Sequence, residues 1–247
     1  MSRLDGKTAV ITGGTSGMGA ATAKLIIERG GRVLVTGRSH ASVDQARLNL
    51  GTSALAVKSA MDSTVELDAL RELIAKHFGE IDFLFLNAGV TRAAPVGAMT
   101  EADYDLVMAV NTKGSYFTLQ RLAPLIKRGG AVVITTSVAN VKGLPMSSVY
   151  AASKAALRSM TRSFARELLP QGIRVNAVSP GPIDTSILEK SMSAEAAAAA
   201  KKHFRDSNPM QRLGQADEIA RAALFLAFEA TFTTGAELPV DGGASQL

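Results

Sequence analysis

The chain has 247 residues, of which 47% are hydrophobic, and it contains no cysteine. This length suits one large domain or two small ones with a sizeable core, and the lack of cysteine excludes disulfides, cysteine–zinc sites and thiol catalysis. The net charge is +5, but the basic residues are scattered and only 5% of residues are aromatic, which argues against a nucleic-acid partner. The N-terminus lacks the apolar segment of a signal peptide, and no apolar run reaches the ~18 residues of a membrane helix. We therefore expect a cytoplasmic protein that contacts neither membranes nor nucleic acids.

Short apolar segments alternate with helical patterns along the whole chain. Strands are predicted at residues 8–12, 32–37, 54–59, 81–87, 130–136, 173–179 and 236–242. Helices are predicted at residues 17–29, 65–78, 101–126, 149–169 and 216–227. Several strands are apolar throughout, as strands buried on both faces of a parallel sheet must be. The alternation predicts an α/β fold, a Rossmann-type doubly wound parallel sheet forming one domain over residues 1–247.

One segment, residues 184–210, interrupts this alternation between the sixth and seventh strands. It is too long for a simple loop, and its alanine run at 196–200 favours a helix. Ligands of open α/β sheets bind at the carboxyl edge of the sheet. We therefore predict a helical insertion that serves as a substrate lid, with a solvent-exposed spacer as the alternative.

A glycine-rich loop joins the first strand to the first helix. Gly13, Gly17 and Gly19 follow the pattern G-x-x-x-G-x-G. Glycine allows the backbone to approach a pyrophosphate, and the helix N-terminus offers unpaired N–H groups and a positive dipole end. The pattern predicts dinucleotide binding by the loop residues Gly13, Thr15, Ser16, Gly17, Met18 and Gly19.

The end of the second strand bears on the choice of cofactor. NAD-binding folds usually place an acidic residue there, which accepts hydrogen bonds from the adenosine ribose. Gly37 occupies about that position in this chain, and Arg38 follows it. An arginine can pair with a 2′-phosphate and stack on adenine. We therefore predict a preference for NADP(H) over NAD(H), although an arginine at a strand end is also an ordinary surface residue.

Several further motifs occur in the order typical of one enzyme family. They are TGGTSGMG at 12–19, Asp62, NAG at 87–89, Asn111, Ser137, Tyr150 with Lys154 four residues later, PGPIDT at 180–185 and VDGG at 240–243. Along nearly its whole length the chain resembles the classical short-chain dehydrogenases/reductases. The resemblance implies an oxidoreductase, and it implies that the helices at 101–126 and 149–169 pair between subunits, commonly in a homotetramer.

The resemblance also implies roles for individual residues. Tyr150 would be the general acid in ketone reduction and the base in alcohol oxidation, and Lys154 would lower its pKa and hold the nicotinamide ribose. Ser137 would hydrogen-bond the substrate carbonyl, and Asn111 would position a water that links Lys154 to solvent. Asp62 would bind the adenine amino group. The remaining cofactor contacts would line the nicotinamide or hold the carboxamide and diphosphate: Asn87, Ala88, Gly89, Pro180, Gly181, Ile183 and Thr185.

Two departures from the family pattern are visible. Leu86 stands where the family often has a first asparagine, which puts a backbone support in doubt. The stretch FLAFEATFTTGAE before the last strand is about a residue shorter than usual, which can alter a turn.

The residues themselves suit acid–base chemistry. Free tyrosine has a pKa near ~10, and a nearby ammonium favours the phenolate. Four residues apart on a helix, Tyr150 and Lys154 share one face, and the alanines around them leave room for a cofactor. Ser137 closes the fifth strand at its carboxyl end. Asn111 is a poor helix former in the middle of a predicted helix, which indicates a kink or a role.

The loop after Ser137 and the lid supply the expected substrate contacts, which are mostly apolar. The loop contacts are Asn140, Leu144, Pro145 and Met146, and the lid contacts are Ile187, Leu188, Met192 and Phe204. This composition favours a ketone or secondary alcohol of medium size. The alternatives are a 3-oxoacyl-[acyl-carrier-protein] reductase, an NAD-dependent sugar or alcohol dehydrogenase, and a non-catalytic dinucleotide sensor. The histidines lie in unrelated contexts, so we expect no metal site.

Overall fold

The computed structural model describes residues 3–186 and 193–247. Its centre is a seven-stranded, fully parallel sheet with the order β3-β2-β1-β4-β5-β6-β7. This arrangement confirms the predicted doubly wound sheet. The strands are β1 (Thr8–Ile11), β2 (Arg32–Gly37), β3 (Ala54–Lys58), β4 (Ile81–Leu86), β5 (Ile126–Thr135), β6 (Arg174–Pro180) and β7 (Glu237–Val240).

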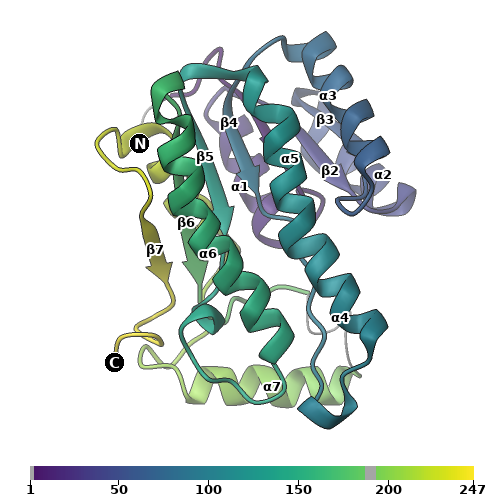
Figure 1. The fold of residues 1–247 in the computed structure, drawn as a ribbon, viewed down its shortest axis with the longest axis vertical. Coiled ribbons are helices and arrows are strands. Elements are labelled where there is room, and N and C mark those ends of the chain that lie inside the picture. Colours follow the sequence, from purple (N-terminus) through teal and green to yellow (C-terminus); the bar gives the residue numbers. More distant parts are fainter. Residues whose placement is uncertain (1–2, 187–192) are drawn as a thin grey trace.

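Helices cover both faces of the sheet (Figure 1). One core contains residues of α1 (Gly17–Glu28), α2 (His40–Leu50) and α8 (Ala216–Leu224). The opposite core contains residues of α3 (Thr64–Phe78), α5 (Gly114–Leu122) and α6 (Ser148–Leu168). Among the α-helices of residues 3–186 and 193–247, α2 is the one that was not expected from the sequence.

The strand residues alternate between these two cores. On β4, Phe83 and Phe85 face the α1 side, whereas Leu84 and Leu86 face the α5 side, and all four are at most 2% exposed. Strands buried on both faces need apolar residues at every position, because successive side chains point to opposite faces. The continuous apolar runs in the sequence therefore reflect the two helical layers.

The prediction of one continuous helix at residues 101–126 is wrong. The segment consists of α4 (Glu101–Val107), a π-helical turn at Met108–Lys113 and α5, followed by a 3₁₀ turn at Ala123–Leu125. Residue Ile126 already begins β5, four residues before the predicted strand start. A second π-helical turn, Phe225–Glu229, follows α8 where a regular helix was expected. Side-chain contacts to distant segments, described below for Asn111, set the first interruption.

Helix α7 (Ala194–Asp206) lies beyond the carboxyl ends of the strands, at the bottom of Figure 1. It confirms the helix that the alanine run predicts within the 184–210 insertion. Within residues 3–186 and 193–247, no helix combines the length and apolar character needed to cross a bilayer.

Candidate active site

Three of the predicted catalytic residues meet where β5 ends. Lys154 is 3% exposed, and its Nζ donates a hydrogen bond to the Thr135 carbonyl at 2.8 Å. The same Nζ lies 5.8 Å from the centroid of the Tyr150 ring, one turn earlier on α6. The Tyr150 hydroxyl is hydrogen-bonded to the side chain of Ser137. Helix α6 thus presents the acid–base pair to the strand end that carries the serine.

Burial dominates the protonation of this pair. It lowers the pKa of Lys154 to about 8, because a desolvated ammonium is disfavoured. Burial also raises the pKa of Tyr150, and the hydrogen bond to Ser137 acts in the opposite direction. The net direction for Tyr150 is opposite to the expected lowering, because desolvation of the phenolate outweighs the favourable contact. A tyrosine in this state keeps its proton at neutral pH and can donate it.

Ser137 is fixed by the local backbone. It is 8% exposed and precedes a 3₁₀ turn at Val138–Asn140, where its Oγ accepts a hydrogen bond from Ala139 N at 3.2 Å. Because the Oγ accepts this hydrogen bond, the turn fixes the direction in which the hydroxyl can form further hydrogen bonds. The turn therefore limits the rotation of the serine side chain beside Tyr150.

Asn111 is fully buried in the π-helical turn. Its Oδ1 accepts from Val90 N at 2.8 Å, and its Nδ2 donates to the Val90 carbonyl at 3.0 Å and to Ser153 Oγ at 3.0 Å. The side chain therefore joins the π-helical turn to the residue after the NAG motif and to α6. The irregularity that asparagine predicts in this helix is confirmed, and its cause is this tertiary contact.

The glycine loop packs directly against the NAG motif. Asn87 Nδ2 donates to the carbonyls of Thr12 at 3.1 Å and Gly13 at 3.2 Å. A Cβ on Gly19 would lie 2.7 Å from that Nδ2, and a Cβ on Gly13, where φ is 62°, would lie 2.9 Å from Ala88 Cα. Only glycine fits at these two positions. The loop thus needs its glycines for internal packing as well as for the approach of a ligand.

The PGPIDT segment faces the same loop. A Cβ on Gly17 would lie 3.5 Å from Thr185 Cγ2. No side chain of the described residues caps the N-terminus of α1, so this end keeps the N–H groups and dipole that suit an anion. Two predicted diphosphate-binding segments therefore converge on one uncapped helix end, and the residues present fit a dinucleotide there.

The two residues predicted to bind the adenosine end of the cofactor lie on the surface. Arg38 and Asp62 are both exposed, and neither forms an ion pair with any residue in the described part of the chain. A Cβ on Gly37 would lie only 2.6 Å from Thr15 Cγ2. The position that usually carries an acid in NAD-binding folds is therefore closed to any side chain while Thr15 keeps its place.

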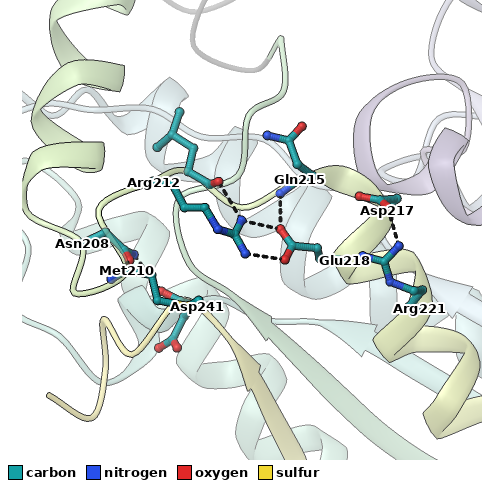
Figure 2. Close-up of polar contacts among 9 residues, drawn as sticks. Asn208, Met210, Arg212, Gln215, Asp217, Glu218, Arg221 and Asp241 are labelled. Atoms are coloured by element: carbon teal, nitrogen blue, oxygen red, sulfur yellow. Dashed lines mark hydrogen bonds and ion pairs between the residues drawn. The ribbon is translucent and has the colours of Figure 1, made fainter.

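Sequence reasoning missed the connection between α7 and α8. Arg212 donates from Nη1 and Nη2 to Glu218 Oε2 and Oε1 at 2.8 and 2.7 Å, and Gln215 N donates to Oε2 at 2.7 Å (Figure 2). This clasp fixes Gly214, whose N–H donates to the Pro182 carbonyl at 3.0 Å and whose carbonyl accepts from Asp184 N at 2.8 Å. The capping-box spacing from Gln215 to Glu218 was the available signal.

Asn208 makes a second attachment of the same connection. Its Nδ2 donates to the Asp241 carbonyl at 2.8 Å, and its Oδ1 accepts from Met210 N at 2.9 Å (Figure 2). The segment after α7 is therefore held both to the PGPIDT motif and to the VDGG motif, which begins at the last residue of β7. These bonds bring two motifs that are far apart in the sequence to one edge of the sheet.

The predicted substrate contacts are less uniform. Leu144 is 38% exposed, and Met146 is 51% exposed with a φ of 62°. Asn140 directs its Nδ2 to Glu237 Oε1 at 2.6 Å. Phe204 lies on α7 and is partly buried. Pro145 is exposed, and the other three predicted contacts, Ile187, Leu188 and Met192, lie outside the described residues.

A cleft of about 610 Å³ is lined in part by Arg212 and Glu218 of this clasp. Its lining is mainly charged and includes Asp184, Lys201 and Arg205. None of the four predicted catalytic residues lines this cleft, so it is distinct from the apolar pocket expected beside Ser137. Among the described residues, no group of three metal-binding side chains occurs.

Leu86, the departure from the family pattern, is 2% exposed and belongs to the hydrophobic core on the α5 side. The backbone beside it is held instead by Thr12, whose Oγ1 accepts from Asn87 N at 3.0 Å and from Ala88 N at 3.1 Å. The NAG motif thus keeps its connection to β1 without a first asparagine.

Comparisons with known proteins agree with this geometry. A family model described as enoyl-(acyl carrier protein) reductase matches residues 13–245. The oxidoreductase asL5 of Sarocladium schorii is 40% identical over 99% of this chain and 98% of its own length. Levodione reductase superposes with a TM-score of 0.92 at 30% identity, covering 98% of this chain and 99% of its own. The 3-ketoacyl-(acyl-carrier-protein) reductase of Brucella melitensis, complexed with NADH, superposes with a TM-score of 0.90 at 33% identity, with the same coverages.

Proposed function

We propose a substrate class and a cofactor for this chain, which belongs to the short-chain dehydrogenase/reductase family and is an NAD(P)-dependent oxidoreductase of CH–OH or carbonyl groups. We propose that it transfers a hydride between NADP(H) and a ketone or secondary alcohol of medium size and mostly apolar character. The contact of Tyr150 with Ser137, one helical turn from the buried Lys154, carries the proposal. It places a proton donor and a second hydroxyl where one carbonyl oxygen can meet both.

Each residue has a distinct task in reduction. The nicotinamide, when bound, supplies the hydride. Tyr150 donates its phenolic proton to the carbonyl oxygen, and Ser137 donates a hydrogen bond to the same oxygen as negative charge develops there. Lys154 has a pKa of about 8, so it is mostly protonated at neutral pH and stabilises the phenolate that remains. In alcohol oxidation the proton moves from the substrate hydroxyl to Tyr150.

The cofactor would lie across the carboxyl edge of the sheet. We propose that the glycine loop and Thr185 hold its diphosphate at the N-terminus of α1, and that the NAG motif lines its nicotinamide side. Asp62 would bind the adenine, and Arg38 would pair with the 2′-phosphate. The lack of an intramolecular partner for Arg38 in the described chain supports the preference for NADP(H).

The insertion at 184–210 would act as the substrate lid. Of the residues of α7, only Ala197 is fully buried, and segments with little buried apolar area open at low cost. We further propose a cytoplasmic homotetramer formed through the helices around α5 and α6, in line with the family resemblance.

A second candidate function is reduction of a 3-oxoacyl thioester on an acyl carrier protein. The similarity to the 3-ketoacyl-(acyl-carrier-protein) reductase of Brucella melitensis favours it. Both candidates share the reaction at Tyr150, and they differ only in what is attached to the carbonyl group.

Two measurements test the proposal. Binding of NADPH and NADH is compared first, and ketones, secondary alcohols and 3-oxoacyl thioesters are then screened with the tighter cofactor. Tyr150→Phe should lower kcat by at least about 10²-fold and retain cofactor affinity. Unchanged turnover in Tyr150→Phe would contradict the proposed chemistry, and tighter NADH binding would contradict the reading of Arg38.

A further inference from the structure

A carboxylate on the edge strand connects the two halves of the candidate active site. The Glu237 side chain is 13% exposed and projects from the start of β7. Its Oε1 accepts hydrogen bonds from Thr136 Oγ1 and from Asn140 Nδ2, both at 2.6 Å, and its Oε2 pairs with Arg158 Nε at 3.0 Å. One carboxylate thus binds three side chains from two different elements.

These partners flank the proposed catalytic residues on both sides. Thr136 directly precedes Ser137, and Asn140 ends the 3₁₀ turn that follows it. Arg158 lies one turn beyond Lys154 on α6. Hydrogen bonds to an ionised carboxylate are shorter and stronger than neutral ones, and a partly buried pair is little screened by salt. Glu237 therefore ties the serine turn to the helix that carries Tyr150.

The edge strand does not need this carboxylate for its own attachment. β7 pairs with β6 over four residues, from Glu237 to Val240, and Leu238 and Val240 pack against the core on the opposite face. Asn140 donates its Nδ2 to Glu237, whereas its Oδ1 is buried and has no hydrogen-bond partner in the described chain. An unpaired buried acceptor is costly, so the orientation of Asn140 is dictated by the carboxylate.

From this arrangement, and resting on the function proposed above, we propose that Glu237 is a positioning residue. It holds the Ser137 turn at its working distance from Tyr150 and Lys154 without touching the substrate. Loss of the negative charge frees Arg158 and loosens both hydrogen bonds to the turn. The serine then loses its alignment with the tyrosine hydroxyl.

Two readouts of Glu237→Gln test this role. Displacement of catalytic groups by about 1 Å costs up to about 10²-fold, so kcat should fall about ten- to a hundredfold while the Kd for NADPH is unchanged. The second readout is the ultraviolet titration of Tyr150, taken as the difference between each protein and its Tyr150→Phe derivative. The hydrogen bond to Ser137 lowers the pKa of Tyr150, so its loss should move the midpoint upward.

Asp82→Asn is the matched control. The Asp82 side chain is 9% exposed, pairs with Lys7 and Lys127, and lies on β4 at the amino edge of the sheet, away from Ser137. It should lower the melting temperature but leave kcat and the tyrosine midpoint as in the wild type. Thr136→Val, which removes one of the three contacts, should shift both readouts in the same direction as Glu237→Gln by a smaller amount.

The outcomes separate this inference from the proposed function. If Glu237→Gln behaves like Asp82→Asn in both readouts, the positioning role is overturned. If Glu237→Gln does not fold, the absence of any shift in Thr136→Val overturns it equally. The titration needs no substrate. If the wild type reduces no carbonyl compound while Glu237→Gln still shows a raised Tyr150 midpoint, the proposed function is refuted and the positioning role stands.

Discussion

The substitution Gly37→Asp alone should not change the cofactor preference of this protein from NADPH to NADH. The substitution supplies the acid that NAD-binding folds use on the ribose hydroxyls. A Cβ at position 37 would lie 2.6 Å from Thr15 Cγ2 and 3.1 Å from Thr15 Oγ1, whereas carbon atoms pack at about 3.5–4.0 Å. The overlap of about 1 Å must be relieved by moving Thr15, and overpacking of this kind costs about 1–3 kcal/mol.

That cost would fall on the cofactor loop. Thr15 lies between Gly13 and Gly17, so its displacement disturbs the backbone proposed to hold the diphosphate of either cofactor. A coupling of 1–3 kcal/mol corresponds to about a five- to 150-fold loss of affinity, and we expect it for both NADPH and NADH. Thr15→Ala removes the two clashing atoms and keeps the backbone unchanged. The double variant Thr15→Ala/Gly37→Asp should therefore bind NADH more tightly than Gly37→Asp alone.

Fluorescence titration of NADPH and NADH against the wild type, the two single variants and the double variant completes a double-mutant cycle. Thr15→Ala alone measures what the threonine side chain itself contributes to the binding of each cofactor, which the cycle then subtracts. A third contact, from Cβ to Ser42 Oγ at 2.9 Å, is relieved by rotation of the serine. Additive effects of the two substitutions, or NADH binding by Gly37→Asp as tight as that of the double variant, would refute the steric argument.

Two predictions concern protonation and stability. Because burial lowers the pKa of Lys154 from 10.5 to about 8, the unfolded chain binds more protons between these values, so the stability of the wild type relative to Lys154→Met should rise as pH increases across that window. Thermal denaturation at several pH values checks this, and a difference independent of pH would contradict it. The hydrogen bonds from Arg212 are the largest cause that lowers the pKa of Glu218, to about 2 from 4.5. The stability that the Glu218 carboxylate contributes is present above pH 4.5 and is lost as pH falls towards 2, so the melting-temperature gap between wild type and Glu218→Gln should close over that range and not stay constant.

The sequence predicts those features that depend on local pattern. The strands follow from continuous apolar runs, and the position of Tyr150 beside Lys154 follows from helical spacing, which the structure confirms by placing Lys154 Nζ 5.8 Å from the tyrosine ring. The break in the helix at Asn111 was indicated only as an irregularity, because its cause is a bond to Val90, 21 residues away. The role of Glu237 had no local signal, since its partner Thr136 is 101 residues distant.

The direction of the Tyr150 pKa was also beyond local reasoning. An ammonium four residues away suggests a lowered value, but Tyr150 is partly buried, and desolvation of its phenol is the larger effect on its pKa. Burial lowers the pKa of Lys154, which brings it closer to neutral pH. The two groups are therefore tuned by their common burial at least as much as by their proximity.

A physical division separates the chemistry from the expected substrate contacts. Asn111, Lys154 and Ser137 are at most 8% exposed. Asn111 and Lys154 form hydrogen bonds to neighbouring segments, and Ser137 forms one within its own turn. Leu144 and Met146, by contrast, are 38% and 51% exposed. Substitution of an exposed loop residue costs little stability, whereas substitution in a buried hydrogen-bonded network costs much more. This fold can therefore change the molecule that it accepts, through the loop after Ser137, without disturbing the atoms proposed to move the proton.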